Sequence, residues 1–281
     1  MDSSQLLGIT TFAYLFSSFC YITILVFRAK KFGMAATLVT TVAFLINSAG
    51  IGLRWYESHQ MGIGYAPLSN MYESLVFFAW SIALFYLGLE FKYKNQTLGA
   101  FSMPFASASM AYASFSAQFG KEIKPLIPAL QSNWLIAHVI TCFIGYAAFA
   151  VACGIGFMYL IKARNEKPAQ GSILASLPSL KEIDDIIHRT LVFGFLWLSA
   201  GIITGAVWAN SAWGTYWSWD PKETWSLITW FVYAAALHAR FTRGWGGKRI
   251  AWLAIIGFLS VIFTYYGVNF LLSGLHSYGG N

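Results

Sequence analysis

Long apolar runs recur along this sequence, and they constrain the fold more than any other feature. A helix that crosses a bilayer needs about 20 mostly apolar residues. Inside the bilayer every backbone polar group must bond within the protein, so such runs are expected to be helices rather than strands. The sequence has eight of them: Leu6–Phe27, Ala35–Leu53, Met71–Leu89, Leu98–Phe119, Trp134–Ile161, Ile187–Trp208, Glu223–Arg240 and Ile250–Leu272. It therefore predicts an all-α polytopic integral membrane protein with about eight transmembrane helices, forming a single domain over residues 1–281.

The fourth run differs from the others in composition. Leu98–Phe119 is rich in Ser and Ala and contains Pro104. A proline inside a helix removes one intrahelical hydrogen bond and clashes with the preceding turn. We therefore expect a short or broken helix in this region.

The overall composition agrees with a membrane protein. Of the 281 residues, 57% are hydrophobic, 18% are aromatic and only 10% are charged, whereas soluble domains carry about 25% charged residues. This composition excludes a disordered chain, a collagen-like chain and nearly any soluble domain. The net charge of +7 arises from short Lys and Arg clusters between the apolar runs, which points to membrane topology and not to a nucleic-acid partner.

The basic residues are distributed unevenly between alternate connections. In membrane proteins Lys and Arg gather in the cytoplasmic connections. With eight spans, one side receives 14 of the 18 basic residues, and the other receives Arg54, Lys121, Lys124 and Lys222. We therefore expect the 14 in the cytoplasm and both termini outside. The N-terminal MDSSQLLG has no early Lys or Arg, so the first run is expected to stay as a helix and not to be cleaved as a signal peptide.

Two further features carry less information. The inner connection Ala163–Ile186 mixes basic and acidic residues and is expected to be a solvated amphipathic loop. The three cysteines, Cys20, Cys142 and Cys153, lie in apolar runs without a CxxC pair, which argues against a disulfide framework or a zinc site. The sequence also lacks CxxCH, so the chain is not itself a c-type cytochrome.

The densest aromatic segment is Trp208–Trp230, which reads WANSAWGTYWSWDPKETWSLITW and holds six of the 12 tryptophans. One interpretation is an interfacial aromatic belt, but a belt distributes a few Trp over many helix ends. The other is an aromatic platform for a flat hydrophobic ligand. Within the segment, Asp220, Pro221 and Glu223 suit the N-cap, N1 and N3 positions of a helix. We therefore expect them to start the seventh helix, so Asp220 and Glu223 have a structural role to fill.

The histidines include two that are placed beside this segment. His138 lies five residues into the fifth run, and His276 follows the eighth run, so both are expected at the depth of the tryptophans. Imidazole is a standard axial ligand of haem iron, and ionisable residues at membrane depth are functional candidates. A haem held by two histidines fits this pattern, as does a quinone-like ligand, while capping or interface roles remain the alternative.

The other histidines are placed differently. His238 lies 13 residues beyond Trp225 on the same predicted helix, which is roughly 20 Å deeper at 1.5 Å per residue. It therefore cannot share a ligand with His138 and His276, and the sequence offers it no histidine partner at that depth. For His238 a helix-end role is the alternative, and His59 and His188 are expected to be ordinary loop or helix-end residues.

Several stretches together resemble one protein family. The run WGTYWSWDPKETWSLITW resembles the tryptophan-rich WWD signature of the haem-handling proteins of cytochrome c biogenesis. The stretches PLSNMYESLVFFAW (Pro67–Trp80), GAVWANSAWG (Gly205–Gly214), LHAR (Leu237–Arg240) and GVNFLLSGLHSYG (Gly267–Gly279) resemble the CcsA family, also called ResC. The resemblance covers most of the chain and is strongest from about residue 185 onward.

The resemblance implies a function that composition does not. Proteins of this family act with a ResB-like membrane partner in the system II pathway. They are thought to carry haem b as a non-covalent substrate from the cytoplasmic side to the outer face. There they present it for attachment to the CxxCH of apocytochrome c, while thiol-reducing proteins contribute indirectly. The implied location is the cytoplasmic membrane of a bacterium or a thylakoid-type membrane, in contact with membrane lipid, with the WWD segment (residues 205–225) outside.

The resemblance also assigns roles to particular residues. His138 and His276 match the two external histidines that ligate haem iron, and His238 matches a transmembrane histidine whose counterpart belongs to the partner. The residues expected to form a haem-binding shelf beside them are Trp213, Tyr216, Trp217 and Trp219, together with Asp220. Most of the rate enhancement would come from positioning, so no dedicated catalytic acid or base is expected, and the chain is expected to be a synthase (haem lyase) subunit.

Three other functions fit the sequence less well. A haem exporter that loads a chaperone, as in CcmC-like relatives, is disfavoured because those proteins lack this length and the Leu237–Arg240 pattern. A b-type electron-transfer cytochrome needs histidines paired within single helices, whereas the successive histidines here are 79, 50, 50 and 38 residues apart. A structural scaffold without haem does not explain the clustered outer histidines and tryptophans.

Overall fold

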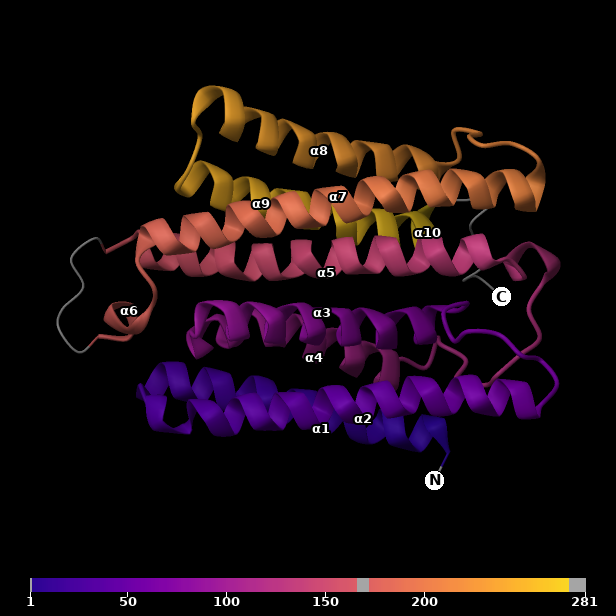
Figure 1. The fold of residues 1–281 in the computed structure, drawn as a ribbon, viewed down its shortest axis with the longest axis horizontal. Helices are drawn as coiled ribbons and strands as arrows, with labels where there is room; N and C mark the ends of the chain where they lie inside the picture. Colours follow the sequence, from indigo (N-terminus) through magenta and orange to yellow (C-terminus); the bar gives the residue numbers. More distant parts are fainter. Residues whose placement is uncertain (1, 166–171, 273–281) are drawn as a thin grey trace.

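The computed structural model describes residues 2–165 and 172–272. Within these ranges the chain forms helices and no strands, as the sequence predicts. The long helices run back and forth in an antiparallel bundle (Figure 1). They are α1 (Ser3–Phe27), α2 (Gly33–Gln60), α3 (Met71–Tyr93), α4 (Gly99–Phe115), α5 (Asn133–Lys162), α7 (Leu180–Trp213), α8 (Pro221–Arg243) and α9 (Lys248–Ile262), which continues through a π-helical turn (Phe263–Gly267) into α10 (Val268–Leu271).

The helix connections gather at two opposite ends of the bundle. We call the end that carries connections 61–70, 116–132 and 214–220 the Trp end, and it lies on the right of Figure 1. We call the opposite end the basic end, and it carries the short helix α6 (Ile173–Ser176) and the connections 28–32, 94–98 and 244–247. Arg54, Lys121, Lys124 and Lys222 all belong to the Trp end. The alternation assumed in the charge argument is therefore present in the fold.

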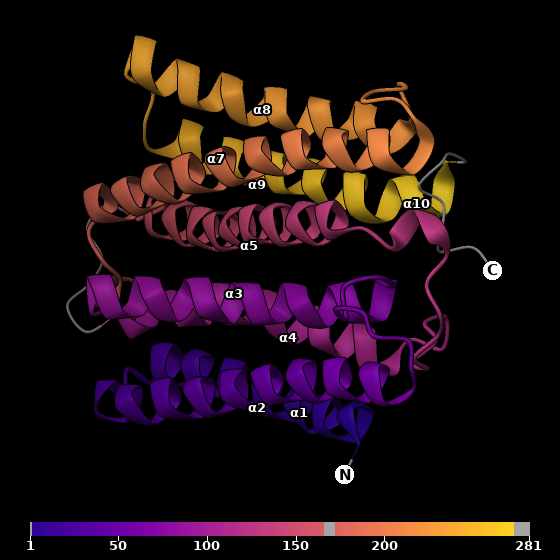
Figure 2. The same ribbon diagram turned by 45° about the vertical axis from the view of Figure 1, so that its right-hand side comes forward.

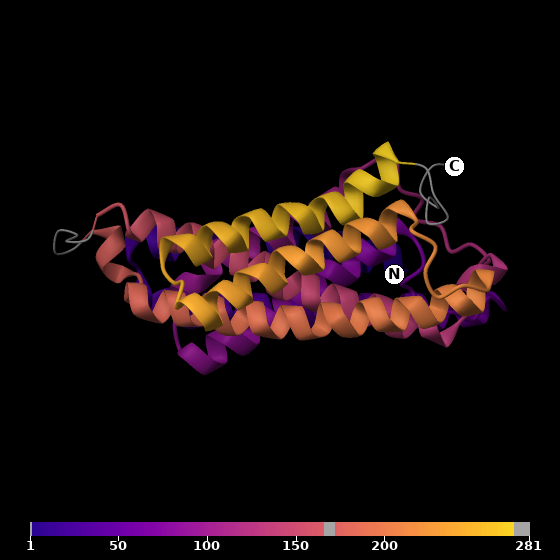
Figure 3. The same ribbon diagram turned by 90° about the horizontal axis from the view of Figure 1, so that it is seen from above.

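The helices form two packed groups (Figures 1 and 2). In the first group α1 packs on α2 and α4, and α3 packs on α4. In the second group α5 packs on α7 and α9, and α8 packs on α7 and α9. Figure 3 shows α7, α8 and α9 lying side by side along their length. The contact between α3 and α5 joins the two groups, so the interior between them is lined by residues of both.

In the part of the chain that the structure describes, six helices are long and apolar enough to cross a membrane: α1, α2, α3, α5, α7 and the continuous helix Lys248–Leu271. The helix α4 has 17 residues and contains Pro104 without interruption, so the expected short helix is present. The helix α8 has 23 residues, but Trp, Thr, His and Arg lower its mean hydropathy. The protein is thus an all-helical integral membrane protein, and spanning by α4 and α8 stays a prediction.

The second helix extends beyond the predicted end at Leu53, because its polar residues are satisfied inside the protein. The Arg54 side chain is only 2% exposed, and its Nε donates to Oε1 of Glu73 in α3 at 2.8 Å. The two terminal nitrogens of Arg54 donate to the backbone carbonyls of Lys121 and Glu122. A charge that the sequence places in an outer connection is therefore buried, and it joins α2 to α3 and to connection 116–132.

The inner connection was predicted to be a solvated loop over Ala163–Ile186, and this is wrong for its second part. The helix α7 begins at Leu180, where the Ser179 hydroxyl and Glu182 form a capping box. Asp184 is partly buried and pairs with Arg240 of α8 at 2.7 Å. Two of the acidic residues that suggested solvation thus have structural roles: Glu182 caps α7, and Asp184 bonds α7 to α8.

Candidate site at the tryptophan end

The His138 ring is held in one orientation by α7. Its Nδ1 lies 2.8 Å from the carbonyl oxygen of Gly201. Since a carbonyl oxygen only accepts, Nδ1 must carry the proton, and Nε2 is then the basic nitrogen of the ring. The Sγ of Cys142, one turn further along α5, lies 3.6 Å from the same Nδ1. This arrangement, with one ring nitrogen bonded to a carbonyl, is the usual one for a metal-ligating histidine.

Two glycines of α7 allow this close approach. A Cβ added at Gly201 would lie 2.5 Å from Sγ of Cys142, and one added at Gly205 would lie 2.6 Å from Nδ1 of His138. Both distances are shorter than any real side-chain contact. Because Gly201 and Gly205 are four residues apart, they lie on the same face of α7. At the level of His138, the side chains of α5 therefore pack directly on the backbone of α7.

Trp208 completes the environment of the ring. Its indole lies nearly parallel to the imidazole of His138, with centroids 5.9 Å apart and 17° between the planes. Trp208 is 3% exposed, and its Nε1 donates to the carbonyl of Ala129 in the connection before α5. Trp213 contacts Trp208 edge-on, with centroids 5.0 Å apart. Sequence reasoning counted Trp208 among the tryptophans but gave it no role, because only the pairing of α7 with α5 places it on the histidine.

The loop of the WWD segment is fixed by the start of α8. The predicted capping box is confirmed: Asp220 is the N-cap, Pro221 begins the helix and Glu223 bonds back to the N-cap backbone. Glu223 also accepts hydrogen bonds from the backbone and hydroxyl of Ser218. Trp219, between them, has a φ of +60°, which is a strained conformation for a residue with a side chain. Both acidic residues thus have a structural role.

The four aromatic residues expected to form a shelf do not share one plane. The rings of Trp217 and Trp219 are 89° apart in orientation, with centroids 5.7 Å apart. Tyr216 is 60% exposed and Trp219 is 69% exposed. Tyr216 and Trp217 line a small cavity of about 70 Å³ that also contacts His138, whereas Trp213 and Trp219 lie outside its lining.

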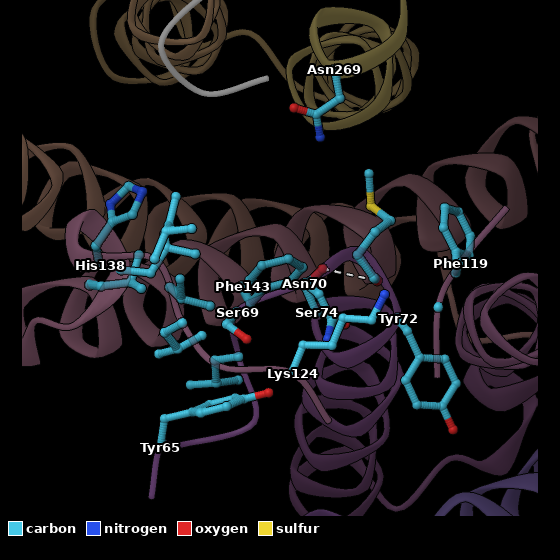
Figure 4. A pocket seen from close by; sticks show the side chains of 18 of the residues that line it. Tyr65, Ser69, Asn70, Tyr72, Ser74, Phe119, Lys124, His138, Phe143 and Asn269 are labelled. Atoms are coloured by element: carbon cyan, nitrogen blue, oxygen red, sulfur yellow. Dashed lines mark hydrogen bonds between the residues drawn. The ribbon is translucent and has the colours of Figure 1, made fainter. Parts of the chain in front are cut away.

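His138 also lines a larger cavity of about 430 Å³. This volume is in the range of small-molecule sites. Figure 4 shows the side chains around it, with His138 reaching it from α5, Asn269 from α10 and Lys124 from connection 116–132. The first half of the stretch Pro67–Trp80 also lines it, from Leu68 to Ser74. The two cavities share five residues: His138, Cys142, Tyr146, Trp208 and Lys222.

Lys222 is the basic residue common to both cavities. Its Nζ donates to Oδ1 of Asn269 at 3.0 Å. Burial lowers the pKa of the Lys222 ammonium to about 8, and the carboxylate of Asp220 opposes that shift. The sequence marked Lys222 only as one of four outer charges, because its neighbour Asn269 is 47 residues away.

The remaining histidines that the structure describes, His59, His188 and His238, are separate from this site. His276 lies outside the described residues. His238 is exposed on α8 toward the basic end. His188 contacts Phe241 in a ring pair with centroids 5.3 Å apart. His59 is exposed in the last turn of α2, where its Nδ1 donates to the carbonyl of Trp55. Within the described ranges, no three His, Cys, Asp or Glu side chains converge on one metal ion.

The chain is similar to proteins of known function over most of its length. The model of the family described as Cytochrome C assembly protein matches residues 68–276. The cytochrome c biogenesis protein CcsA of Guillardia theta is 41% identical over 97% of this chain and 95% of that protein. CcsA of Prochlorococcus marinus (strain MIT 9313) is 40% identical over 86% of this chain and 83% of that protein.

A solved structure has the same fold. The cytochrome c haem lyase CcmF superposes with a TM-score of 0.68 over 94% of this chain, at 17% sequence identity. This chain covers 47% of that protein. At such low identity the likeness shows the arrangement of helices alone. The extent and identity of the sequence matches show that the chain belongs to the cytochrome c assembly protein family and, within it, to the CcsA proteins of cytochrome c biogenesis.

Proposed function

We propose that this protein brings haem to the Trp end and presents it for covalent attachment to the CxxCH of apocytochrome c, together with a ResB-like membrane partner. The observation that carries this proposal is the position of His138. His138 lines both cavities, and its ring is stacked on Trp208 and held by Gly201 with Nε2 as the basic nitrogen. Membership of a cytochrome c biogenesis family supplies the substrate.

In the proposed reaction the main task of the protein is to position the haem relative to the cysteine thiols. Two cysteine thiols add to the two vinyl groups of haem, which forms two thioether bonds. In this proposal the Nε2 of His138 and the imidazole of His276 would ligate the haem iron. Tyr216 and Trp217, which line the small cavity, shield one edge of the ring, and Trp213 and Trp219 extend the aromatic surface. Fixing the vinyl groups beside the thiols is the main source of acceleration.

The partner is proposed from the exposed face of α8. Ile228, Phe231, Ala235 and His238 are all exposed and follow one another at spacings of three, four and three residues, so they form one stripe along the helix. An apolar stripe that contains a histidine suits a helix of another chain that supplies a second imidazole. We assign His238 to a separate haem position, shared with the ResB-like protein at the depth of the basic end.

The membrane placement is part of the same proposal. The Trp end faces the outside and the basic end faces the cytoplasm, because the sequence assigns 14 of the 18 basic residues to the connections of the basic end or to the helix ends beside them. Both termini then lie outside, and α4 and α8 complete eight spans. The membrane is the cytoplasmic membrane of a bacterium or a thylakoid-type membrane, where the relatives from Guillardia and Prochlorococcus suggest a plastid or cyanobacterial type.

A maturation assay tests the proposed function. The chain is expressed with a ResB-like partner and a CxxCH reporter in bacteria that lack their own cytochrome c maturation genes. We expect covalent haem on the reporter with the wild-type pair, none on an AxxAH reporter, and at least a tenfold loss with His138→Ala. Covalent haem that persists in His138→Ala would overturn the proposal. Haem transferred to a chaperone without reporter maturation would support the CcmC-like alternative instead.

A further inference from the structure

Lys222 is a partly buried cation whose Nζ donates to a neutral amide, that of Asn269, and the carboxylate whose charge acts on it is that of Asp220. Lys222 belongs to none of the ion pairs among the described residues. The Asp220 carboxylate, two residues earlier, is directed to the backbone N–H of Lys222 as the helix cap. Removing an ammonium from water is costly unless an anion compensates it. The position of Lys222 is thus unexplained by packing within the described part of the chain.

The last helix of the chain orients the Lys222 ammonium through Asn269. The π-helical turn Phe263–Gly267 changes the register of the last helix, as such turns often do at functional sites. The amide nitrogen of Asn269 donates to the carbonyl of Tyr265 at 2.8 Å. That bond leaves Oδ1 of the same amide to accept from Nζ of Lys222. The turn therefore orients Asn269, and Asn269 holds the ammonium at the boundary of both cavities.

The same turn fixes the floor of the larger cavity. The Tyr265 hydroxyl bonds to the hydroxyl of Ser74 in α3, so Tyr265 is anchored to the other helix group. Tyr265, Asn269 and Lys222 all line the cavity. Lys222, Asn269 and Tyr265 are thus joined by hydrogen bonds, from Lys222 to Asn269 and from Asn269 to Tyr265, and they line the same cavity as His138.

We propose that Lys222 is the counter-charge for a carboxylate of the ligand that His138 binds. An ammonium has three donors, of which Asn269 occupies one. The others can bond a carboxylate without displacing any contact in the structure. For haem, the carboxylates are the two propionates on one edge of the ring. Anchoring that edge at Lys222 places the opposite, vinyl-bearing edge away from Lys222, so this residue sets the orientation of the substrate. The inference rests on the proposed function.

The test compares haem with its dimethyl ester, in which the propionates carry no charge. Both are titrated into the purified full chain in detergent, for the wild type, Lys222→Met and Lys222→Arg. Hydrogen bonds to charged groups are worth roughly 1.5–3 kcal/mol, or about tenfold to hundredfold in affinity. We expect Lys222→Met to bind haem weaker by that factor and to bind the ester as the wild type does. We expect Lys222→Arg to recover most of the difference.

A matched control is Lys121→Met, a lysine of the same end that is exposed and lies outside the cavity lining. It should leave both affinities unchanged. If Lys222→Met keeps the full wild-type preference for haem over the ester, the inference is wrong, even though haem binding through His138 stands. If the wild type and His138→Ala bind both compounds equally, the proposed function itself fails. A preference lost equally in Lys121→Met would show a general charge effect, which also overturns the inference.

Discussion

At the scale of single residues, the site depends on contacts between positions far apart in the chain. The sequence indicated His138 correctly as a residue at the depth of the tryptophans, because its distance from the start of a long apolar run is readable. It could not indicate that the Gly201 carbonyl would accept a hydrogen bond from Nδ1 of His138, or that Trp208 would stack on its ring. Those contacts depend on how α5 packs against α7. An apolar run in the sequence does not show which residues of two packed helices face each other.

The tight contact between α5 and α7 leads to a prediction for Gly205. A methyl group there collides with the imidazole of His138, so Gly205→Ala should rotate or displace the ring. We expect haem content to fall at least fivefold, measured as absorbance per mole of purified protein. The matched control is Gly88→Ala, where a Cβ meets nothing within 4 Å. Full haem content in Gly205→Ala would contradict the role given to the His138 orientation.

At the scale of elements, the caps and turns were more predictable than the helix lengths. The first residue of α8 was predicted correctly from Asp220, Pro221 and Glu223, because a capping box is a local sequence signal. The ends of α2 and the start of α7 were missed, since both lie in stretches with charged residues. There the charges are neutralised by distant partners: Arg54 by Glu73, and Asp184 by Arg240. A single sequence does not reveal such pairs.

The buried pair of α2 and α3 yields a stability prediction. Arg54→Met leaves Glu73 buried without its partner and releases the carbonyls of Lys121 and Glu122. Breaking a buried pair from one side costs about 3–5 kcal/mol. We expect a clear fall in the midpoint of thermal unfolding in detergent. The double variant Arg54→Met with Glu73→Gln should recover part of that loss, and a double variant less stable than the sum of the singles would refute the pairing.

At the scale of the whole molecule, the sequence predicts an all-helical membrane protein, because hydropathy and the alternation of basic clusters are properties of the entire chain. It does not predict the two helix groups or the cavity between them. The lining of that cavity combines residues near 70, 120–140, 222 and 265–269. Their convergence follows from how α3 packs on α5 and how α10 returns to the Trp end.

The orientation in the membrane can be tested with single new cysteines. Thr215, in the loop of the Trp end, and Thr242, at the basic end of α8, are both exposed. With a membrane-impermeant maleimide on intact cells, we expect Thr215→Cys to be labelled and Thr242→Cys to be labelled only after permeabilisation. Wild type corrects for the three native cysteines, of which Cys142 and Cys153 are buried. The reverse pattern would invert the proposed topology.

The most direct measurement of the central claim is the absorption spectrum of the purified protein, alone and with its ResB-like partner. Wild type is compared with His138→Ala, His276→Ala and His238→Ala. The account predicts low-spin haem in the wild type, loss of one population in both His138→Ala and His276→Ala, and loss of a second, partner-dependent population in His238→Ala. If no haem copurifies, or if all three variants retain the wild-type spectrum, the ligand assignments are wrong, and the Trp end must serve as a docking surface for apocytochrome alone.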